Sequence, residues 1–406
     1  MLPQAAPQPA HTPSLTLPRD AVIPDYGAGG LYGLVTNIRA YLNGAPWSPP
    51  LSERDILHRE GDRRRSLVFL LIDGLGDHFL QRHGGSSTLL AHRIGRLTSV
   101  FPSTTASAVT TTLTGLAPAV HGLTGWFIHD RRFGGVLAPL PMLVRGDGPA
   151  EGLLILQRLF PYQTLFQRRT RPATVVYPHY LAGSPFSRRH SRGARVVAYR
   201  GLDGMTDAIV AEVQSFGQQG GYVHAYYPVF DALSHAHGCE APEVIARYKH
   251  IDASFARLLE QLHGRHCDVV VCADHGFIDS PPERQIRLED YPHAKSLLAT
   301  PLFGERRAAF FRVRPGAEED FRAFADDVLK GKAALVRSDD LRETGLLGPG
   351  KPHRRLNERT GSHALLMEPG WTILDRLADE TEHTMLGVHG GLSPQEMWIP
   401  LIHAHC

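Results

Sequence analysis

Three short runs of apolar residues stand out along the chain, and each of them leads within a few positions to an aspartate. They span 66–72 (SLVFLLI), 221–227 (GYVHAYY) and 267–273 (CDVVVCA). A short apolar run that is bounded by polar residues is typical of a strand buried on both faces of a parallel sheet. The sequence therefore predicts three buried strands, each of which leads into a polar loop.

Helical spacing of apolar residues occurs next to the second and third of these strands. A long helix is predicted between them, because apolar residues recur every three or four positions at Val244, Ile245, Tyr248, Ile251, Phe255, Leu258, Leu259 and Leu262. A shorter helix is predicted over about 205–216, before the second strand. This alternation of strands and helices predicts an α/β fold with a mostly parallel sheet.

The segment 300–385 has a different pattern. Residues 308–313 (AAFFRV) read as a strand, 317–330 as a helix with one apolar face, and 334–336 as a short return strand. Strands and a helix in this order favour a small α+β insertion rather than a continuation of the parallel sheet.

The domain organisation follows from this difference. Residues 26–299 and 386–406 are predicted to form the main α/β domain, and 300–385 the α+β insertion. Residues 1–25 are rich in proline and polar residues, so we expect them to form a tail or an extended arm on the surface.

Composition excludes several classes of protein. The 43 Lys and Arg residues nearly balance the 41 Asp and Glu residues of the 406-residue chain, and this balance argues against a nucleic acid polymer as a partner. The longest apolar run, 67–72, is far shorter than the roughly 20 residues that a membrane helix needs. The four cysteines show no disulfide spacing and the first twenty residues hold no signal-peptide core, which predicts a cytoplasmic protein.

Carboxylates and imidazoles come directly after the predicted strands. They are Asp73 after the first strand, Asp231 and His235 after the second, Asp274 and His275 after the third, and His389 before a further apolar run near the C-terminus. Because the carboxyl ends of parallel strands meet at one edge of a sheet, these side chains are expected to converge. This mixture of ligands favours zinc, with manganese or iron as alternatives, and six groups divide into two sets of three.

Each of these residues also has a simpler interpretation. An aspartate before a glycine, as at 73–74, is common in turns, and either His235 or His237 could be the imidazole after the second strand. The joint occurrence of the groups, in order and after strands, favours a metal site over a chance arrangement.

A candidate nucleophile lies in the segment 101–108 (FPSTTASA), which precedes a Thr-rich, helix-like stretch ending at Gly115. The positive field at a helix N-terminus stabilises an alkoxide and an incoming phosphate. Serine and threonine at such positions also act as ordinary helix caps. A metal-bound threonine, by contrast, would ionise near neutral pH and could attack phosphorus.

These residues, in this order, resemble the type I phosphodiesterase/nucleotide pyrophosphatase family of the alkaline phosphatase superfamily. The resemblance runs from about 66 to 402 and rests on LLIDGLG, VFPSTTAS, TGLAPAVHGLTGW, YYPVFDALSHAHG, VVCADHGF and GVHGGLSPQEMWIPLI. It implies a three-layer αβα fold and a hydrolase of phosphate esters, a phosphodiesterase or nucleotide pyrophosphatase that uses two divalent metal ions.

The resemblance also implies a role for each matched residue. The first ion would be bound by Asp73, Thr105, Asp274 and His275, and the second by Asp231, His235 and His389. Thr105 matches the family nucleophile and would form a phospho-threonine intermediate. Thr104, its neighbour, remains the alternative nucleophile.

One position departs from the family pattern. Members usually carry an asparagine shortly after the His-Gly pair, and here Trp126 stands in its place, although an indole can donate only one hydrogen bond. Tyr177 and His179 could line a nucleotide or phosphate pocket, and a surface loop is an equal alternative. The alternative functions are a phosphomonoesterase or phosphomutase of the same superfamily, and a metal-binding effector without turnover. The sequence leaves the oligomeric state open.

Overall fold

The computed structural model describes residues 15–47, 65–377, 380 and 384–406. A seven-stranded sheet lies at the centre, with the strand order β2-β19-β10-β1-β9-β7-β8. The strands are β1 (Ser66–Ile72), β2 (Arg93–Thr98), β7 (Ala173–Pro178), β8 (Arg195–Tyr199), β9 (Tyr222–Tyr227), β10 (Cys267–Cys272) and β19 (Trp398–His405). Among them β19 alone runs antiparallel to its neighbours, so the predicted α/β fold with a mostly parallel sheet is confirmed.

The three strands predicted from apolar runs are neighbours at the middle of this sheet. Strand β1 pairs with β10 on one side and with β9 on the other, and all residues of the three strands are buried. Burial on both faces explains why these segments read as continuous apolar runs rather than as alternating ones. The parallel register brings the ends of the three strands to one edge of the sheet, where Asp73 and Asp274 follow directly.

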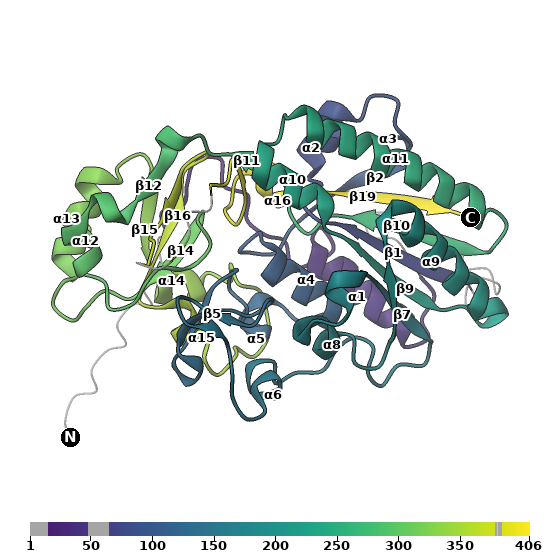
Figure 1. Ribbon diagram of the computed structural model, residues 1–406, viewed down its shortest axis with the longest axis horizontal. Coiled ribbons are helices and arrows are strands. Elements are labelled where there is room, and N and C mark those ends of the chain that lie inside the picture. Colours follow the sequence, from purple (N-terminus) through teal and green to yellow (C-terminus); the bar gives the residue numbers. More distant parts are fainter. Residues whose placement is uncertain (1–14, 48–64, 378–379, 381–383) are drawn as a thin grey trace, which may run out of the picture.

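Helices cover both faces of the sheet. Figure 1 shows α9 (Gly201–Phe216), α11 (Pro242–Leu262), α2 (Asp77–His83) and α3 (Thr88–Ala91) on one side, and α1 (Leu31–Leu42), α4 (Thr105–Thr114) and α8 (Pro185–His190) on the other. The long predicted helix is confirmed as α11. The shorter one begins four residues earlier than predicted, because Gly201 and Gly204 resemble a loop in the sequence but lie in the first turn of α9.

A second, four-stranded sheet lies beside the central one, in the order β13-β14-β16-β15. It consists of β13 (Phe303–Gly304), β14 (Ala308–Phe311), β15 (Ala333–Arg337) and β16 (His363–Met367), with α12 (Pro292–Ser296), α13 (Glu318–Val328) and α14 (Ser338–Glu343). The expected strand, helix and return strand correspond to β14, α13 and β15. In the sheet, however, β14 and β15 are not neighbours, because β16 lies between them and pairs with both. The boundaries of an insertion domain at 300–385 stay a prediction.

A further small sheet of β3 (Ile128–Asp130), β4 (Gly135–Ala138), β5 (Leu143–Val144) and β6 (Gly148–Pro149) was not expected from the sequence. Strands of two to four residues are too short to show a period. The remaining elements are α5 (Pro118–His121), α6 (Ile155–Leu159), α7 (His179–Ala182), α10 (Val229–His237), α15 (Leu356–Thr360), α16 (Pro394–Met397), and the strand pairs β11 (Ile278–Asp279) with β18 (Gly387–Val388) and β12 (Gln285–Arg287) with β17 (Thr372–Leu374).

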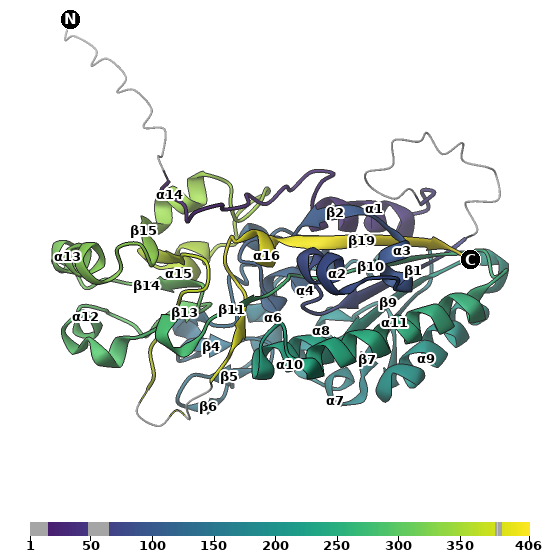
Figure 2. The same cartoon turned by 90° about the horizontal axis from the view of Figure 1, so that it is seen from above.

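The described part of the predicted N-terminal arm is extended. Leu15, Leu17 and Val22 pack against the apolar cluster that includes β13, β14 and β16, and the backbone N–H of Val22 donates to Leu392 O at 2.8 Å. Figure 2 shows this purple segment running from beside α14 to α1. Residues 1–14 of the predicted tail lie outside the described residues.

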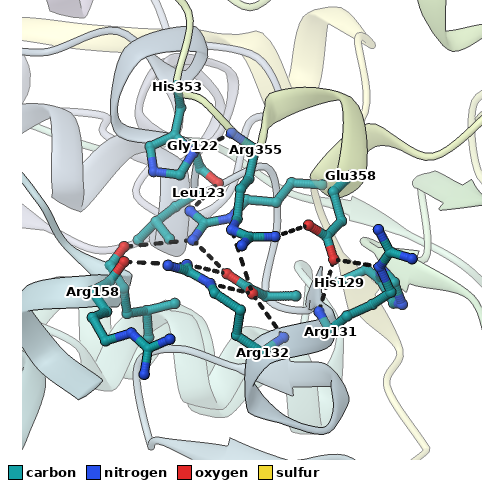
Figure 3. Close-up of polar contacts among 12 residues, drawn as sticks. Gly122, Leu123, His129, Arg131, Arg132, Arg158, His353, Arg355 and Glu358 are labelled. Carbon is teal, nitrogen blue, oxygen red and sulfur yellow. Dashed lines mark hydrogen bonds and ion pairs between the residues drawn. The ribbon is translucent and has the colours of Figure 1, made fainter. Parts of the chain in front are cut away.

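A buried polar network joins β3 to α15 and to the loop that leads to Trp126 (Figure 3). Asp130 accepts hydrogen bonds from Arg132 Nε and Nη2, at 2.9 and 2.7 Å, and from Arg359 Nη2 at 3.3 Å. Arg359 is fully buried and donates through Nη1 to Gly122 O at 2.9 Å. Nearby, Arg355 Nη1 donates to Glu358 Oε2 at 2.6 Å. The network therefore holds the backbone just before Trp126 in place.

Replacing Asp130 with alanine is expected to lower the free energy of unfolding by about 3–5 kcal/mol, because it leaves the buried Arg359 guanidinium without its carboxylate. Chemical denaturation at pH 7 measures this change. The control is Asp207→Ala, whose carboxylate is 66% exposed beside Arg257 and for which a loss below about 1 kcal/mol is expected. Equal losses in the two variants would contradict the assigned role of Asp130.

The same carboxylate predicts a dependence of stability on pH. Burial alone would raise the pKa of Asp130, but the hydrogen bonds and charges of Arg132 and Arg359 outweigh burial and lower it to about 2. Since the pKa in the folded state lies below the ordinary value of about 4, the stabilisation is complete above about pH 4 and is lost as the pH falls towards 2. The difference between wild type and Asp130→Ala should shrink over that range.

Candidate metal centre and active site

The predicted metal ligands come together at the carboxyl edge of the central sheet. Asp73 follows β1, Asp274 and His275 follow β10, and Asp231 lies in the first turn of α10, just after β9. Two groups of three potential ligands result, each with its ligand atoms within 4.8 Å of one another: Asp73, Asp274 and His275 form one, and Asp231, His235 and His389 form the other. These are the two sets expected from the sequence, apart from the hydroxyl of Thr105.

The first group is centred on the Nε2 atom of His275. This atom lies 3.4 Å from Asp73 Oδ1, 3.4 Å from Asp274 Oδ2 and 3.3 Å from Thr105 Oγ1. All three ionisable side chains are buried, so their polar atoms face one another rather than water. The hydroxyl of Thr105 therefore lies beside the imidazole that both carboxylates of this group approach.

The second group is built around Asp231 Oδ1. His235 Nε2 lies 3.5 Å and His389 Nε2 3.7 Å from this oxygen, and the two Nε2 atoms are 3.2 Å apart. His275 Nε2 lies 4.0 Å from the same oxygen, so the two groups are adjacent. Their role as ligands of two ions stays a prediction.

The carboxylates of the site lack partners for some of their oxygens. Among the described residues, Asp73 Oδ1, Asp231 Oδ1 and Asp274 Oδ2 are buried side-chain atoms that accept no hydrogen bond. Burial raises the pKa of Asp73 well above its ordinary value, and the charges of Asp231 and Asp274 raise it further, although the hydroxyl of Tyr226 donates to Asp73 Oδ2. Three clustered, unpartnered carboxylate oxygens fit a bound cation, which would compensate both their burial and their repulsion.

The three imidazoles of the site are also oriented as cation binding requires. The Nδ1 atoms of His235, His275 and His389 lie 2.8, 3.1 and 3.2 Å from the backbone carbonyls of Gly387, Gly276 and Ser103. A carbonyl can only accept, so Nδ1 carries the proton in each neutral ring and the lone pair of Nε2 faces the centre. Burial lowers the pKa of His389 well below its usual value and that of His235 to about 4, which keeps both rings neutral. Backbone carbonyls behind imidazoles are typical of metal-binding histidines.

The two candidate nucleophiles occupy different surroundings. Thr105 is the first residue of α4, and its Oγ1 faces His275. Thr104, the N-cap residue, is fully buried and donates from Oγ1 to Glu305 Oε1 at 2.5 Å. The hydroxyl of Thr105 therefore lies beside the candidate ligands, whereas that of Thr104 is engaged elsewhere. This geometry favours Thr105, and its role as nucleophile stays a prediction.

Glu305 is a residue of the site that the sequence reasoning missed. Its Oε1 also accepts a hydrogen bond from the backbone N–H of Trp126 at 2.5 Å, so a single carboxyl oxygen holds Thr104 and Trp126 together. Burial raises the pKa of Glu305 to about 7, although these two hydrogen bonds act in the opposite direction. The segment LFGERRAA around it carries no motif and lies in the predicted insertion, far from the other site residues in sequence.

A cavity of about 800 Å³ opens from this site. Thr105, Asp231 and His389 line one end of it, together with Trp126 and Glu305. Trp126, predicted to bind substrate, is 39% exposed and lies in its wall.

The two other predicted substrate residues lie away from this cavity. Neither Tyr177 nor His179 is among the described residues that line it. Tyr177 is buried in β7 with its ring against Tyr226, and His179 Nε2 lies 2.8 Å from Arg200 Nη1. Tyr177 thus packs behind Tyr226, which itself donates to Asp73. Their role in binding substrate is not supported by this placement.

A third group of potential ligands lies near the opposite end of β10, where Asp268 Oδ1 meets His403 Nε2 at 2.9 Å and His405 Nδ1 at 2.6 Å. Its other oxygen accepts a hydrogen bond from Arg65 Nε at 3.0 Å. Because the Arg65 guanidinium already balances the charge of the Asp268 carboxylate, we interpret these residues as an ion-pair network between β10 and β19 rather than as a metal site.

The fold and the paired groups of carboxylates and imidazoles define a protein of the alkaline phosphatase superfamily. The model of the type I phosphodiesterase / nucleotide pyrophosphatase family matches residues 67–392. The chain therefore belongs to that family, as its motifs indicated.

One curated relative is an uncharacterised pyrophosphatase/phosphodiesterase of Schizosaccharomyces pombe, which is 26% identical over 182 residues. The match covers 42% of this chain and 36% of that protein, so the chain spans about a third of its relative's length.

Solved structures share the fold. Human ectonucleotide pyrophosphatase/phosphodiesterase 5 aligns over 84% of this chain and 87% of its own, with a TM-score of 0.62 and 17% identity. The mouse protein aligns over 83% and 87%, with a TM-score of 0.61 and 17% identity. Phosphonoacetate hydrolase from Sinorhizobium meliloti aligns over 84% and 90%, with a TM-score of 0.60 and 17% identity. At this level of identity these likenesses show a common fold.

Proposed function

We propose that this protein is a metal-dependent phosphodiesterase or nucleotide pyrophosphatase that uses two divalent ions and Thr105 as its nucleophile. The observation that carries the proposal is the pair of adjacent groups, with three unpartnered carboxylate oxygens and three Nε2 atoms, and the hydroxyl of Thr105 beside His275 in the first of them. Family membership supports it, as does the mouse fold relative, an inactive form of which has been solved in complex with AMP.

The residues at the site fit this role. Asp73, Asp274 and His275 would hold one ion with Thr105, and Asp231, His235 and His389 the other. When bound, such ions polarise the phosphoryl oxygens and favour the ionised forms of a bound hydroxyl and of water. Nitrogen and oxygen donors in sets of three or four favour zinc, with manganese or iron as alternatives.

The reaction assigned to the side chains is a double displacement at phosphorus. The Oγ1 atom of Thr105, having given its proton to solvent, forms a bond to phosphorus while the bond to the departing alcohol oxygen breaks and that oxygen gains a proton. Water then attacks the phospho-threonine, which restores the hydroxyl of Thr105 and releases a phosphate monoester. Thr105 is the first residue of the ten-residue helix α4, so the positive end of this helix would stabilise the negative charge of a phosphoryl group bound to Thr105.

The test measures bound metal and turnover on the same preparation. Elemental analysis should find close to two ions per chain, and bis-p-nitrophenyl phosphate should be hydrolysed faster than p-nitrophenyl phosphate. Preference for the monoester would favour a phosphomonoesterase or phosphomutase. Two bound ions without turnover of diesters, pyrophosphates or monoesters would indicate a metal-binding effector and refute the proposed enzyme.

A cytoplasmic location remains part of the proposal. All four cysteines are free thiols in the structure, which supports a reducing compartment. In the described part of the chain, none of the helices has both the length and the apolar character to cross a bilayer.

A further inference from the structure

The cavity next to Thr105 has a mainly apolar wall beyond its reactive end. Trp126 and Phe127 lie on one side, Leu143 extends from β5, and Leu302, Phe303 and Ile373 come from the segments around the second sheet. Its volume of about 800 Å³ lies towards the upper end of the range for ligand pockets, about 300–1,000 Å³. A group that binds there would bury surface against this apolar wall, which favours an apolar group.

Arg145, a cation in this wall, is not available to a second phosphate. Its Nη1 donates to Asp375 Oδ1 at 2.7 Å, and its Nε and Nη2 donate to Glu380 at 2.7 and 2.8 Å. The guanidinium also lies 5.2 Å from the ring centre of Phe127, and the side chain is only 7% exposed. Arg287, Arg306 and Arg376, which also line the cavity, have interactions of their own. Arg145 therefore completes the wall instead of attracting anions.

The reactive end of the cavity carries an acidic side chain, Glu305, where a second phosphate would need a positively charged one. Glu305 is held by Thr104 and Trp126, and both Thr104 and Trp126 line the cavity with it. Whether ionised or neutral, a carboxyl group offers no positive charge to a phosphate. A diphosphate extending from the metal groups into this cavity would pass Glu305 and enter an apolar space.

We infer that the cavity binds an uncharged alkyl or acyl chain attached to the phosphoryl group, so that the substrate is a phosphodiester with one apolar ester group. The inference rests on the proposed function, since it assumes that the phosphoryl group sits between Thr105 and the two ligand groups. It selects a diester with an apolar chain over a nucleoside diphosphate or pyrophosphate.

The test is a binding series on the metal-loaded wild-type protein, measured by calorimetry with ethyl, butyl, hexyl and decyl phosphate below their aggregation concentrations. AMP and inorganic pyrophosphate are the comparators. Because each buried methylene is worth up to about fourfold in affinity, Kd should fall steadily from ethyl to hexyl phosphate, and decyl phosphate should bind more tightly than AMP. A Kd that is independent of chain length, or tighter binding of AMP or pyrophosphate than of decyl phosphate, would overturn the inference.

A pair of variants tests where the alkyl group of the ligand binds. Leu143→Asp places a charge on a half-exposed residue of the wall, so it should weaken binding of decyl phosphate at least tenfold more than binding of ethyl phosphate. Leu153→Asp is the matched control, because Leu153 is 82% exposed and does not line the cavity. It should leave every Kd unchanged. Equal effects of the two variants on the Kd values would contradict the position assigned to the alkyl group in the cavity.

The two proposals fail in different ways. Hydrolysis of bis-p-nitrophenyl phosphate with no dependence of Kd on chain length refutes the apolar substrate and leaves the diesterase intact. Tight, length-dependent binding without hydrolysis of any diester refutes the enzyme and leaves the apolar site intact.

Discussion

Replacing Thr105 with alanine is expected to lower kcat for bis-p-nitrophenyl phosphate by at least about 10³-fold, because the side chain that forms the bond to phosphorus is lost. Binding of alkyl phosphates to the metal-loaded variant should stay within about tenfold of wild type, since the other six candidate ligands remain. Steady-state kinetics and calorimetry on the same preparation separate these two effects.

Two conservative variants identify the attacking hydroxyl. Thr105→Ser keeps a hydroxyl beside His275 and should recover part of the activity that Thr105→Ala loses. Thr104→Val keeps the shape of Thr104 and removes its hydrogen bond to Glu305, so a loss of less than about tenfold is expected, comparable to one hydrogen bond. An inactive Thr104→Val variant together with an active Thr105→Ala variant would identify Thr104 as the nucleophile.

Removal of metal is expected to abolish turnover and to destabilise the protein. A site occupied at about 1,000 times its Kd contributes about 4 kcal/mol to the free energy of unfolding, and two such sites contribute more. The midpoint of thermal unfolding should therefore fall by several degrees in the presence of a chelator, and zinc or manganese should restore both midpoint and turnover. An unchanged midpoint and full activity in the chelated protein would exclude the two-ion site.

The effect of the chelator should also depend on pH. In the metal-free protein, burial and mutual repulsion raise the pKa of Asp73, and burial with the charges of Asp274 and Glu305 raises that of Asp231. A carboxyl whose pKa is raised on folding stabilises the folded state at low pH, and this stabilisation is lost as the pH rises through the raised value. The chelated protein should therefore lose more stability at pH 8 than at pH 5.

An Asp231→Asn variant serves as the internal control for the number of ions. Asp231 Oδ1 lies 3.5 Å from His235 Nε2 and 3.7 Å from His389 Nε2, so loss of the carboxylate charge should remove one of two ions and leave the group around His275 occupied. Loss of both ions, or of neither, would contradict the division into two groups.

The sequence identified the central strands and the long helix because their signals are local. Burial on both faces makes β1, β9 and β10 continuously apolar, and one buried face gives α11 its period of three to four residues. The short strands β3 to β6 carry no such signal, and β16 was missed because its pairing partners are distant in the chain. The start of α9 was misjudged because its first turn contains two glycines.

For the site, position after a buried strand was the informative signal. It indicated Asp73, Asp231 and Asp274 from sequence, because the carboxyl ends of parallel strands meet at one edge of a sheet. Nothing comparable marks Glu305, which directly follows strand β13 of a different sheet and is separated from Thr104 by about two hundred residues of chain. Tyr177 was selected for its chemistry alone, and the structure places its ring behind Tyr226.

The sequence by itself thus determined the family, the central α/β sheet and the residues that gather at its edge, because all of these follow from patterns within single segments. Only the tertiary structure decided which hydroxyl faces His275 and what surrounds the substrate. The cavity is lined mainly by residues from 126–146, 287–309 and 373–376, with Glu380, Met385 and His389, and these come together although they are far apart in the chain. Its apolar wall and the position of Glu305 at its reactive end depend on that packing, and local spacing does not encode them.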